Sequence, residues 1–478
     1  MLDKRQFYIN GKWTDPAVRR DCEVINPSNE EVCAVISLGD QADTDAAVAA
    51  ATDAFETWST TPKSERIALV ERIQEVYNAR YDEMAEAMSL EMGAPIDFAK
   101  KEQTGAGAWH IENFIAAAKE FEFDRPLSAD EPDNRILYEP VGVCGLITPW
   151  NWPMNQVTLK VIPALLTGCT MVLKPSEIAP LSSYLFAEFV DEAGAPAGVF
   201  NLVNGDGPGV GVQLSTHKDV HMISFTGSTR AGAAIAKNAA DSFKRVFTEL
   251  GGKGANIIFS DADANAVKRG VRHCFSNTGQ SCNAPTRMLV ERGRYEEAVA
   301  EAQATAEATE VGPSDSSGRH IGPVISQTQY DKIQGMVQKG IDEGARLIAG
   351  GTGRPEGFER GYFVRPTIFA DVNNTMAIAR EEIFGPVLSI IPFDTEEEAV
   401  QIANDTDYGL TNYIQSQDPE RVKRVTRRLR SGMVEANGSS LGAGSPFGGM
   451  KASGNAREGG EWGLEDFLEV KAVSGWSN

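Results

Sequence analysis

The sequence predicts an α/β protein built on two series of parallel strands with crossover helices. From Val143 onward, short apolar runs alternate with helical stretches, which is the pattern of strand–helix–strand units in a parallel sheet. A second series of the same kind begins near Asp261. The length of 478 residues agrees with this, because it corresponds to about three domains or two large ones.

The composition is that of a globular chain, with 42% hydrophobic and 23% charged residues. The formal net charge of −22 disfavours nucleic acid and anionic membranes as partners, because both are negatively charged. Six cysteines without a CxxC pair do not resemble a disulfide framework, and five histidines show no HExxH spacing. We therefore expect no nucleic-acid partner, no membrane partner and no metal.

The chain is expected in the cytoplasm. Its first residues, MLDKRQFYINGKW, lack the apolar region of a signal peptide. The longest mostly apolar stretch, Val161 to Leu173, is interrupted by Pro163 and Gly168 and is too short to cross a bilayer. The cysteine usage fits a reducing compartment.

Helices are predicted over residues 43–118, where apolar side chains recur every three or four positions from Ser64 onward. Ser64 is expected as an N-cap and Gly93 as the residue that ends a helix. The first strand series follows, with helices over Ser182–Ala193 and Thr229–Ala240, and right-handed crossovers would make it a doubly wound, Rossmann-like sheet. Its apolar runs are CGLIT, TMVLK, VFNLV, MISFTG, RVFTEL and ANIIF.

The second series predicts a second α/β domain. Helices are expected over residues 294–310 and 326–343, separated by the polar, glycine-rich loop Gly312–Gly322. Its apolar runs are TRMLVE, VLSIIPF, TNYIQS and MVEAN.

The segment FTGSTRAG (Phe225–Gly232) is a candidate phosphate site. It closes an apolar run and opens a helix with Ser228 near the N-cap, where free N–H groups and the helix dipole attract an anion. The alternative is an ordinary capped helix without a ligand. No GxGxxG or GxxxxGK[ST] pattern follows a predicted strand.

Two residues are candidates for covalent and acid–base chemistry. Cys282 lies in FSNTGQSCNAPTR, whose small polar residues suit a thiolate, although a buried structural cysteine is the alternative. Glu249 stands between an apolar run and two glycines in TELGGKGAN, where it is either a general base in a cleft or a solvated carboxylate.

Two further motifs end apolar runs of the first series. TPWNWP (Thr148–Pro153) places the Asn151 amide between two tryptophans, which suits a cleft at the carboxyl end of a strand. KPSE places Lys174 and Glu177 where they could bind ribose hydroxyls. The alternatives are an aromatic-packed turn and two solvated charges.

The order and spacing of these motifs resemble the aldehyde dehydrogenase superfamily over nearly the whole chain. The resemblance implies that the chain oxidises an aldehyde to the carboxylic acid with NAD, through a thiohemiacetal and a thioester acyl-enzyme. The resembling segments are TPWNWP, LKPSE, FTGST, ELGGK, GQSC, EEIFGPV (Glu381–Val387) and SPFGGMKASGNARE (Ser445–Glu458).

The resemblance also implies the catalytic roles. Cys282 would be the nucleophile, and Asn151 with the backbone N–H of Cys282 would form the oxyanion hole. Glu249 would activate the water that hydrolyses the thioester, and members that pass the acyl group to coenzyme A lack a carboxylate there. Glu458 matches a carboxylate proposed to pass protons in some members, although Ala456 replaces a common glycine nearby.

Cofactor contacts are implied in the same way. Lys174 and Glu177 match contacts to the adenine-side ribose, and Glu177 would make NAD preferred over NADP, because a carboxylate repels a 2′-phosphate. Trp150 and Ser228 match pyrophosphate contacts. Glu382 would hold the nicotinamide-side ribose, with Phe384 beside the nicotinamide. The implied substrate pocket, which contains no basic residue and favours a neutral aldehyde, is Trp152, Gln156, Leu159, Ser281, Asn283, Leu441 and Phe447.

The implied architecture has three parts. Residues 1–120 and 141–249 would form a Rossmann-like cofactor domain, and residues 250–463 an α/β catalytic domain. Residues 121–140 (with RILYEP) and 464–478 (with EVKAVSGW) would form a small β extension for a homodimer or homotetramer. A thioester or ester hydrolase would use Cys282 and Glu249 alone, and a non-catalytic relative would have lost them.

Overall fold

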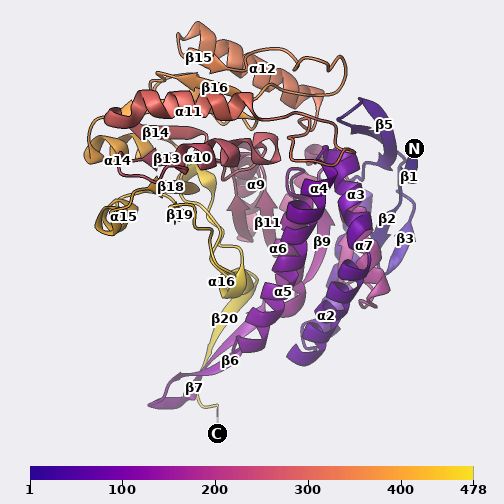
Figure 1. Ribbon diagram of the computed structural model, residues 1–478. Coiled ribbons are helices and arrows are strands. Elements are labelled where there is room, and N and C mark those ends of the chain that lie inside the picture. Colours follow the sequence, from indigo (N-terminus) through magenta and orange to yellow (C-terminus); the bar gives the residue numbers. More distant parts are fainter. Residues whose placement is uncertain (477–478) are drawn as a thin grey trace.

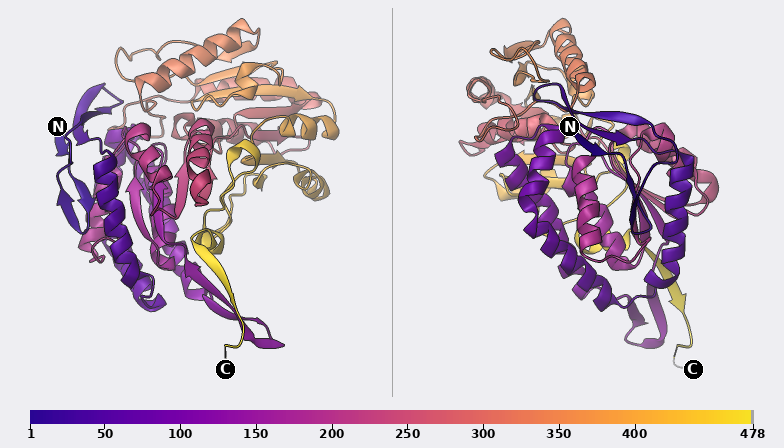
Figure 2. Two further views of the ribbon diagram at one scale, coloured as in Figure 1. Left: turned by 180° about the vertical axis from the view of Figure 1, so that it is seen from behind. Right: turned by 90° about the vertical axis from the view of Figure 1, so that its right-hand side faces the viewer.

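The computed structural model describes residues 1–476 and contains two large sheets and two small ones. Figure 1 shows the second large sheet with its helices above the first, and a thin β extension projecting downward beside the C-terminus. The opposite view in Figure 2 shows the same separation of the extension from the rest of the molecule. The fold is thus mixed α/β, as the sequence predicts.

The first large sheet has the order β12-β11-β8-β9-β10-β2-β3. Strands β8 to β12 are all parallel to one another. At one edge, β2 pairs antiparallel with β10, and β3 pairs antiparallel with β2. The order reverses between β8 and β11, and the carboxyl ends of strands at such a switch point form a ligand crevice. The strands are β2 (Phe7–Ile9), β3 (Lys12–Thr14), β8 (Val143–Ile147), β9 (Thr170–Lys174), β10 (Phe200–Leu202), β11 (Met222–Thr226) and β12 (Arg245–Glu249).

Helices cover both faces of this sheet because side chains of its buried strands alternate between two cores. In β8, Cys144 and Leu146 pack in one core, whereas Val143 and Ile147 pack in the other. The helices are α1 (Gln41–Trp58), α2 (Lys63–Ala79), α3 (Tyr81–Met92), α4 (Ile96–Phe98), α5 (Gly105–Glu120), α6 (Pro153–Thr167), α7 (Leu181–Glu192), α8 (Val212–Thr216) and α9 (Thr229–Ala239).

The second large sheet has the order β15-β16-β17-β14-β13-β18-β19 and is parallel except at β15. The strands are β13 (Ala255–Ile258), β14 (Arg287–Glu291), β15 (Arg346–Ala349), β16 (Thr367–Ala370), β17 (Val387–Phe393), β18 (Thr411–Gln415) and β19 (Met433–Ala436). The helices of this sheet are α10 (Ala266–Phe275), α11 (Tyr295–Glu307), α12 (Gln327–Asp342), α13 (Ala377–Arg380), α14 (Glu396–Asn404) and α15 (Pro419–Thr426). The last helix, α16 (Gly460–Glu465), packs instead against α5 and α6.

Two local expectations are wrong. The run ANIIF was expected in the first series, but β13 pairs with β14 and β18 of the second sheet. The chain crosses between the sheets in Leu250–Gly254, and strand periodicity carries no signal for such a crossing. Ser64 is not an N-cap, because α2 already begins at Lys63 after Pro62, whose φ of −53° suits a helix start. Gly93 does end α3 in the left-handed region, with φ +78°.

The extension is a three-stranded antiparallel sheet of β6 (Asp124–Ser128), β7 (Glu131–Pro140) and β20 (Leu468–Val473). The two segments expected to be β-rich therefore pair with each other, for example Tyr138 with Val470. Residues 477–478 of the expected extension lie outside the described residues. The sequence did not indicate a further small sheet, which is formed by β1 (Leu2–Lys4), β4 (Asp21–Asn26) and β5 (Glu31–Ser37). Among the described helices, none is both long and apolar enough to cross a membrane.

Candidate active site

The predicted site residues lie where the two large sheets face each other. Asn151, Lys174, Ser228 and Glu249 stand at or just beyond the carboxyl ends of strands β8, β9, β11 and β12 in the first sheet. Cys282 precedes β14, and Glu382 and Phe384 precede β17, so these three belong to amino ends of strands in the second sheet. The five residues Leu250–Gly254 connect the two edges directly.

The glycines of this connection let the two sheets approach. A Cβ on Gly252 would lie 2.3 Å from the Cys282 carbonyl oxygen, and a Cβ on Gly251 would lie 2.6 Å from Oε2 of Glu382. The backbone N–H of Gly252 donates to Oε1 of Glu382 at 2.8 Å. ELGGK thereby brings Glu249, Cys282 and Glu382 into one neighbourhood.

The loop before Cys282 has an unusual backbone. Asn277, Thr278 and Gly279 all have positive φ, at 51°, 57° and 71°. A β-branched residue is rarely found there, and such strain persists only where the surroundings enforce it. Thr278 Oγ1 donates to the Gly322 carbonyl at 3.1 Å. A Cβ on Gly279 would lie 2.1 Å from the Gly385 carbonyl oxygen, so only glycine fits.

A buried amide network holds this loop to the first sheet. Asn151 Nδ2 donates to the Gln280 carbonyl at 2.9 Å, and Asn277 Nδ2 donates to the Asn151 carbonyl at 2.9 Å. Gln103 Nε2 donates to the same Asn151 carbonyl at 3.1 Å and to Asn277 Oδ1 at 3.2 Å. Asn277 and Gln280 lie in the predicted Cys282 segment but had no assigned role, and Gln103 was not predicted, because polar residues next to apolar runs look like ordinary surface positions.

Cys282 is a half-buried free thiol. Burial raises its pKa most, and the nearby carboxylates of Glu249 and Glu382 raise it further, whereas the Asn283 backbone N–H opposes this. The resting group is therefore a protonated thiol at neutral pH. A reaction that needs the thiolate must remove this proton locally.

Glu249 is a deeply buried acid in the same region. It is 2% exposed, and neither carboxylate oxygen has a hydrogen-bond partner among the described residues. Burial raises its pKa well above the usual range, and the Glu458 charge raises it further. Lys160, Arg457 and the nearby Gly449 backbone N–H act in the opposite direction. A buried polar group without a partner is costly, so such groups are typical of functional sites.

Glu458 is held by a buried ion pair. Lys160 Nζ donates to the Glu458 carboxylate and also to Thr226 Oγ1, the latter at 2.8 Å. The side chains of Lys160 and Glu458 are 1% and 5% exposed. Oε2 of Glu458 has no partner, so this carboxylate retains an acceptor near Glu249. Glu458 was predicted from the sequence, whereas Lys160, which lies between Leu159 and Val161 in a buried helix, was not.

Lys174 and Glu177 form the pair expected from KPSE. Nζ of Lys174 donates to the carbonyls of Pro175 and Gly205 at 2.7 and 2.5 Å, and Oε2 of Glu177 lies 3.6 Å away. Burial lowers the pKa of Lys174, and Glu177 opposes this change. The buried ammonium beside a partly exposed carboxylate offers both a donor and an acceptor to hydroxyl groups.

Ser228 is the N-cap of α9, and its Oγ accepts from the Ala231 backbone N–H at 3.3 Å.

The rings of Trp150 and Phe384 meet edge to face, with centroids 5.4 Å apart and planes at 88°. Phe384 has φ +60°, and Gln329 Nε2 fixes its carbonyl with a 2.7 Å hydrogen bond. The fold thus brings two predicted aromatic residues from different sheets into contact.

A cavity of about 290 Å³ begins beside Asn283, the residue after Cys282. Four residues of the expected substrate pocket line it, namely Leu159, Asn283, Leu441 and Phe447. Trp152 and Ser281 do not line it and instead bond to each other, with Trp152 Nε1 donating to Ser281 Oγ at 2.9 Å. Gln156 is also absent from its wall. Its wall also includes polar residues that no sequence motif indicated, among them His110, Asn113, His273 and Glu435.

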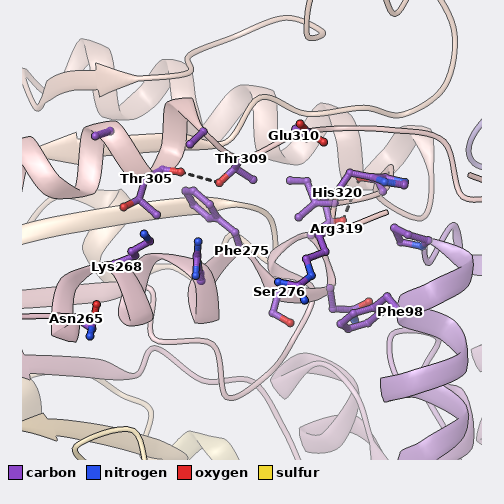
Figure 3. Close-up of a pocket in the computed structure, with 18 of the residues that line it drawn as sticks. Phe98, Asn265, Lys268, Phe275, Ser276, Thr305, Thr309, Glu310, Arg319 and His320 are labelled. Atoms are coloured by element: carbon purple, nitrogen blue, oxygen red, sulfur yellow. Dashed lines mark hydrogen bonds between the residues drawn. The ribbon is translucent and has the colours of Figure 1, made fainter. Parts of the chain in front are cut away.

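A larger cavity, of about 790 Å³, lies elsewhere. Figure 3 shows it between the labelled residues Lys268, Phe275, Thr305 and Arg319, where α10 faces α11. None of the nine predicted catalytic and cofactor residues lines it. Within residues 1–476, no three His, Cys, Asp or Glu side chains gather as metal ligands would.

The model of the "Aldehyde dehydrogenase family" matches residues 13–473. A 3-succinoylsemialdehyde-pyridine dehydrogenase from a Pseudomonas species is 52% identical over 478 residues, covering 100% of this chain and 99% of that protein. The structure is similar to an aldehyde dehydrogenase from Bartonella henselae, with TM-score 0.99, 63% identity and coverage of 99% and 100% of the two chains.

A second solved structure shows bound ligands. It is a mutant of aldehyde dehydrogenase C from Pseudomonas syringae in complex with NAD+ and octanal. Its TM-score is 0.97 at 49% identity, and the match covers 99% of this chain and 97% of that one.

Proposed function

Since the chain belongs to the aldehyde dehydrogenase family, we propose that it oxidises an aldehyde to the carboxylic acid with NAD, using Cys282 as nucleophile. The observation that carries this proposal is the carboxylate of Glu249, which is buried near the Cys282 thiol and has no hydrogen-bond partner among the described residues. A base with no structural partner is free to take a proton during the reaction.

The residues around the crevice fit a dinucleotide. Glu177 and Lys174 present an acceptor and a donor for ribose hydroxyls, and Glu382 presents a second acceptor. Ser228 and Trp150 would hold the pyrophosphate, with the N-terminal N–H groups of α9 as further donors. Phe384 would lie against the nicotinamide, which accepts hydride when bound.

The first half of the reaction belongs to Cys282 and Asn151. The Cys282 thiol gives its proton to a water molecule, and its sulfur then forms a bond to the aldehyde carbon. The carbonyl oxygen becomes an oxyanion, which one hydrogen of the Asn151 amide and the Cys282 backbone N–H would hold. One such donor lowers the barrier by about 3–4 kcal/mol. Loss of hydride from the adduct leaves a thioester on Cys282.

Glu249 performs the second half. Its carboxylate takes a proton from water, and the water oxygen attacks the thioester carbon as the C–S bond breaks. The products are the carboxylic acid and the Cys282 thiolate. The charges of Lys160 and Glu458 both act on Glu249. This pair would accept the proton that Glu249 takes from water and pass it onward.

We also propose the three-part domain division, with residues 1–120 and 141–249, 250–463, and 121–140 with 464–478. In the third part, β6 and β20 each leave one strand edge unpaired, with Leu127 and Val470 exposed by 54% and 61%. Such edges suit pairing with another subunit, so a homodimer or homotetramer is proposed.

The six free cysteines support a reducing, cytoplasmic location.

The proposal is tested by NADH absorbance with a panel of aliphatic, aromatic, amino and carboxylated aldehydes. Because a 52% identical relative is a 3-succinoylsemialdehyde-pyridine dehydrogenase, that pyridine semialdehyde belongs in the panel. We expect NADH formation by the wild type and none by Cys282→Ala, which should still bind NAD. Retention of more than a few per cent of kcat by Cys282→Ala would contradict the assignment.

A further inference from the structure

The cavity beside Asn283 has a wall that the aldehyde chemistry does not use. Helices α5, α6 and α10, strand β19 and the loop 440–447 all contribute to it. Its polar residues away from Cys282 are therefore available to the far end of a substrate whose aldehyde carbon lies at the thiol.

Glu435 is placed in this wall by strand register. It lies on β19 directly opposite Tyr413 of β18. The Tyr413 hydroxyl donates to the Asn283 carbonyl at 2.7 Å, so one strand pair connects Glu435 to the residue next to the nucleophile. Residue 435 is half-buried and lines the cavity.

The Glu435 carboxylate has no compensating partner. Burial alone raises its pKa, with no hydrogen bond or neighbouring charge contributing to the shift. Within the described chain, Glu435 forms no ion pair. A half-buried carboxylate without a partner gains from a cation or a strong hydrogen-bond donor.

The other titratable groups in the wall do not supply that cation. Burial lowers the pKa of His110 to about 4, and its Nε2 lies 2.8 Å from Asn155 Oδ1, so the ring is neutral at pH 7. Burial also lowers the pKa of His273, which packs against Tyr413. Glu458 is a second carboxylate of the wall; its Oε1 pairs with Lys160, which does not line the cavity, and its Oε2 has no partner. Among the described lining residues there is no lysine or arginine.

The remaining wall suits an organic cation. Trp109, Phe114 and Phe447 give the cavity aromatic side chains, and an ammonium group near such faces is attracted to their π-electrons. A substrate carboxylate would instead meet the negative charge of Glu435 without any basic partner.

We propose that Glu435 binds a protonated amine at the far end of the substrate, so that the chain prefers aminoaldehydes to alkyl aldehydes of the same length. This substrate class rests on the aldehyde oxidation proposed above. The carboxylated aldehyde of the same size should be the poorest substrate of the three.

The test compares isosteric pairs by kcat/KM with NAD: 3-aminopropanal with butanal, and 6-aminohexanal with heptanal. In the wild type we expect the amine to be favoured in at least one pair by about tenfold or more, as a net 1.4 kcal/mol gives. Glu435→Gln should bring that ratio close to one, mainly through KM for the amine. The matched control is Glu461→Gln, an exposed carboxylate outside the cavity, which should keep the wild-type ratio.

The proposal is overturned if the wild type prefers the amine in neither pair, or if Glu435→Gln keeps the preference. In both cases oxidation of the alkyl aldehydes still supports the general function. Oxidation of no aldehyde at all overturns both. The pH dependence of the wild-type ratio is independent of any variant. Because Glu435 must be ionised, the amine preference should decrease as the pH falls through its raised pKa, and an unchanged ratio contradicts the assignment.

Discussion

The side-chain amide of Asn151 donates a 2.9 Å hydrogen bond to the backbone carbonyl of Gln280. Asn151 follows a strand of the first sheet, and Gln280 stands two residues before Cys282 in the second part of the molecule. The bond therefore sets the position of the proposed oxyanion donor relative to the nucleophile. An asparagine amide has two hydrogens, so one remains for the substrate oxygen.

Gln103→Leu should damage this relationship without touching the substrate. It removes the donor to the Asn151 carbonyl and to Asn277 Oδ1, leaving buried acceptors with fewer partners. We expect a loss of about 1–3 kcal/mol in unfolding free energy and a lower kcat with little change in NAD affinity. Denaturant titration and steady-state kinetics measure both. The control Gln338→Leu changes an exposed glutamine and should leave the unfolding free energy and kcat unchanged. If Gln103→Leu is as active as the wild type, the network does not position Asn151.

Glu249→Gln should slow deacylation far more than hydride transfer. The amide cannot take a proton from water, whereas Cys282 can still attack the aldehyde. Stopped-flow absorbance should show a rapid first turnover of NADH followed by slow steady-state turnover. Simultaneous loss of the burst and the steady state would mean that Glu249 serves the thiol or the structure instead.

Glu458→Gln should shift the pH dependence of steady-state turnover. The base must be ionised, so kcat rises with pH through the raised pKa of Glu249. The charge of Glu458 raises that pKa and Lys160 lowers it, so removing the Glu458 charge should move the acidic limb to lower pH. The profile of kcat against pH, with circular dichroism to verify folding, measures this. A limb that stays in place or moves to higher pH argues against the coupling.

NAD should be preferred over NADP because of Glu177. Its carboxylate can accept hydrogen bonds from ribose hydroxyls but repels a 2′-phosphate, at a cost on the order of one to a few kcal/mol. Lys174, with Nζ 3.6 Å from that carboxylate, could pair with the phosphate, so a preference rather than exclusion is expected. We predict that Glu177→Ser raises kcat/KM for NADP. Equal or better use of NADP by the wild type would refute the preference. An unchanged kcat/KM for NADP in the variant would show that Glu177 does not discriminate between the cofactors.

Much of the fold follows from periodicity. The strands of both large sheets that carry continuous apolar runs, such as β9 and β17, and the helices ended by glycine, such as α3, agree with the predicted ranges. Short or amphipathic strands were not predicted: β1 to β4 and β15 lack a long buried run. β5 was also not predicted, although its last four residues are buried. The assignment of β13 to its sheet depends on a chain crossing that only tertiary packing decides.

The site was predictable as a set of motifs and not as a geometry. The local sequences left alternatives open for Cys282, Glu249 and Asn151, and the order of the motifs with the family resemblance assigned their roles. The residues that hold them in place were not predicted. Gln103 lies in a π-helical turn between α4 and α5, and Lys160 lies among apolar residues of α6. Their partners are 48 and 298 residues away along the chain, so no local pattern indicates the contacts.

The central claim is that the acyl group passes through Cys282, and trapping it tests this most directly. Glu249→Gln is mixed with NAD and an aldehyde, quenched in acid after the first turnover, and digested for mass spectrometry. The account predicts one acyl group per active subunit, carried by the peptide that contains Cys282 and removed by hydroxylamine. An acyl group on another residue, or a full burst of NADH with no acylated peptide, would contradict it.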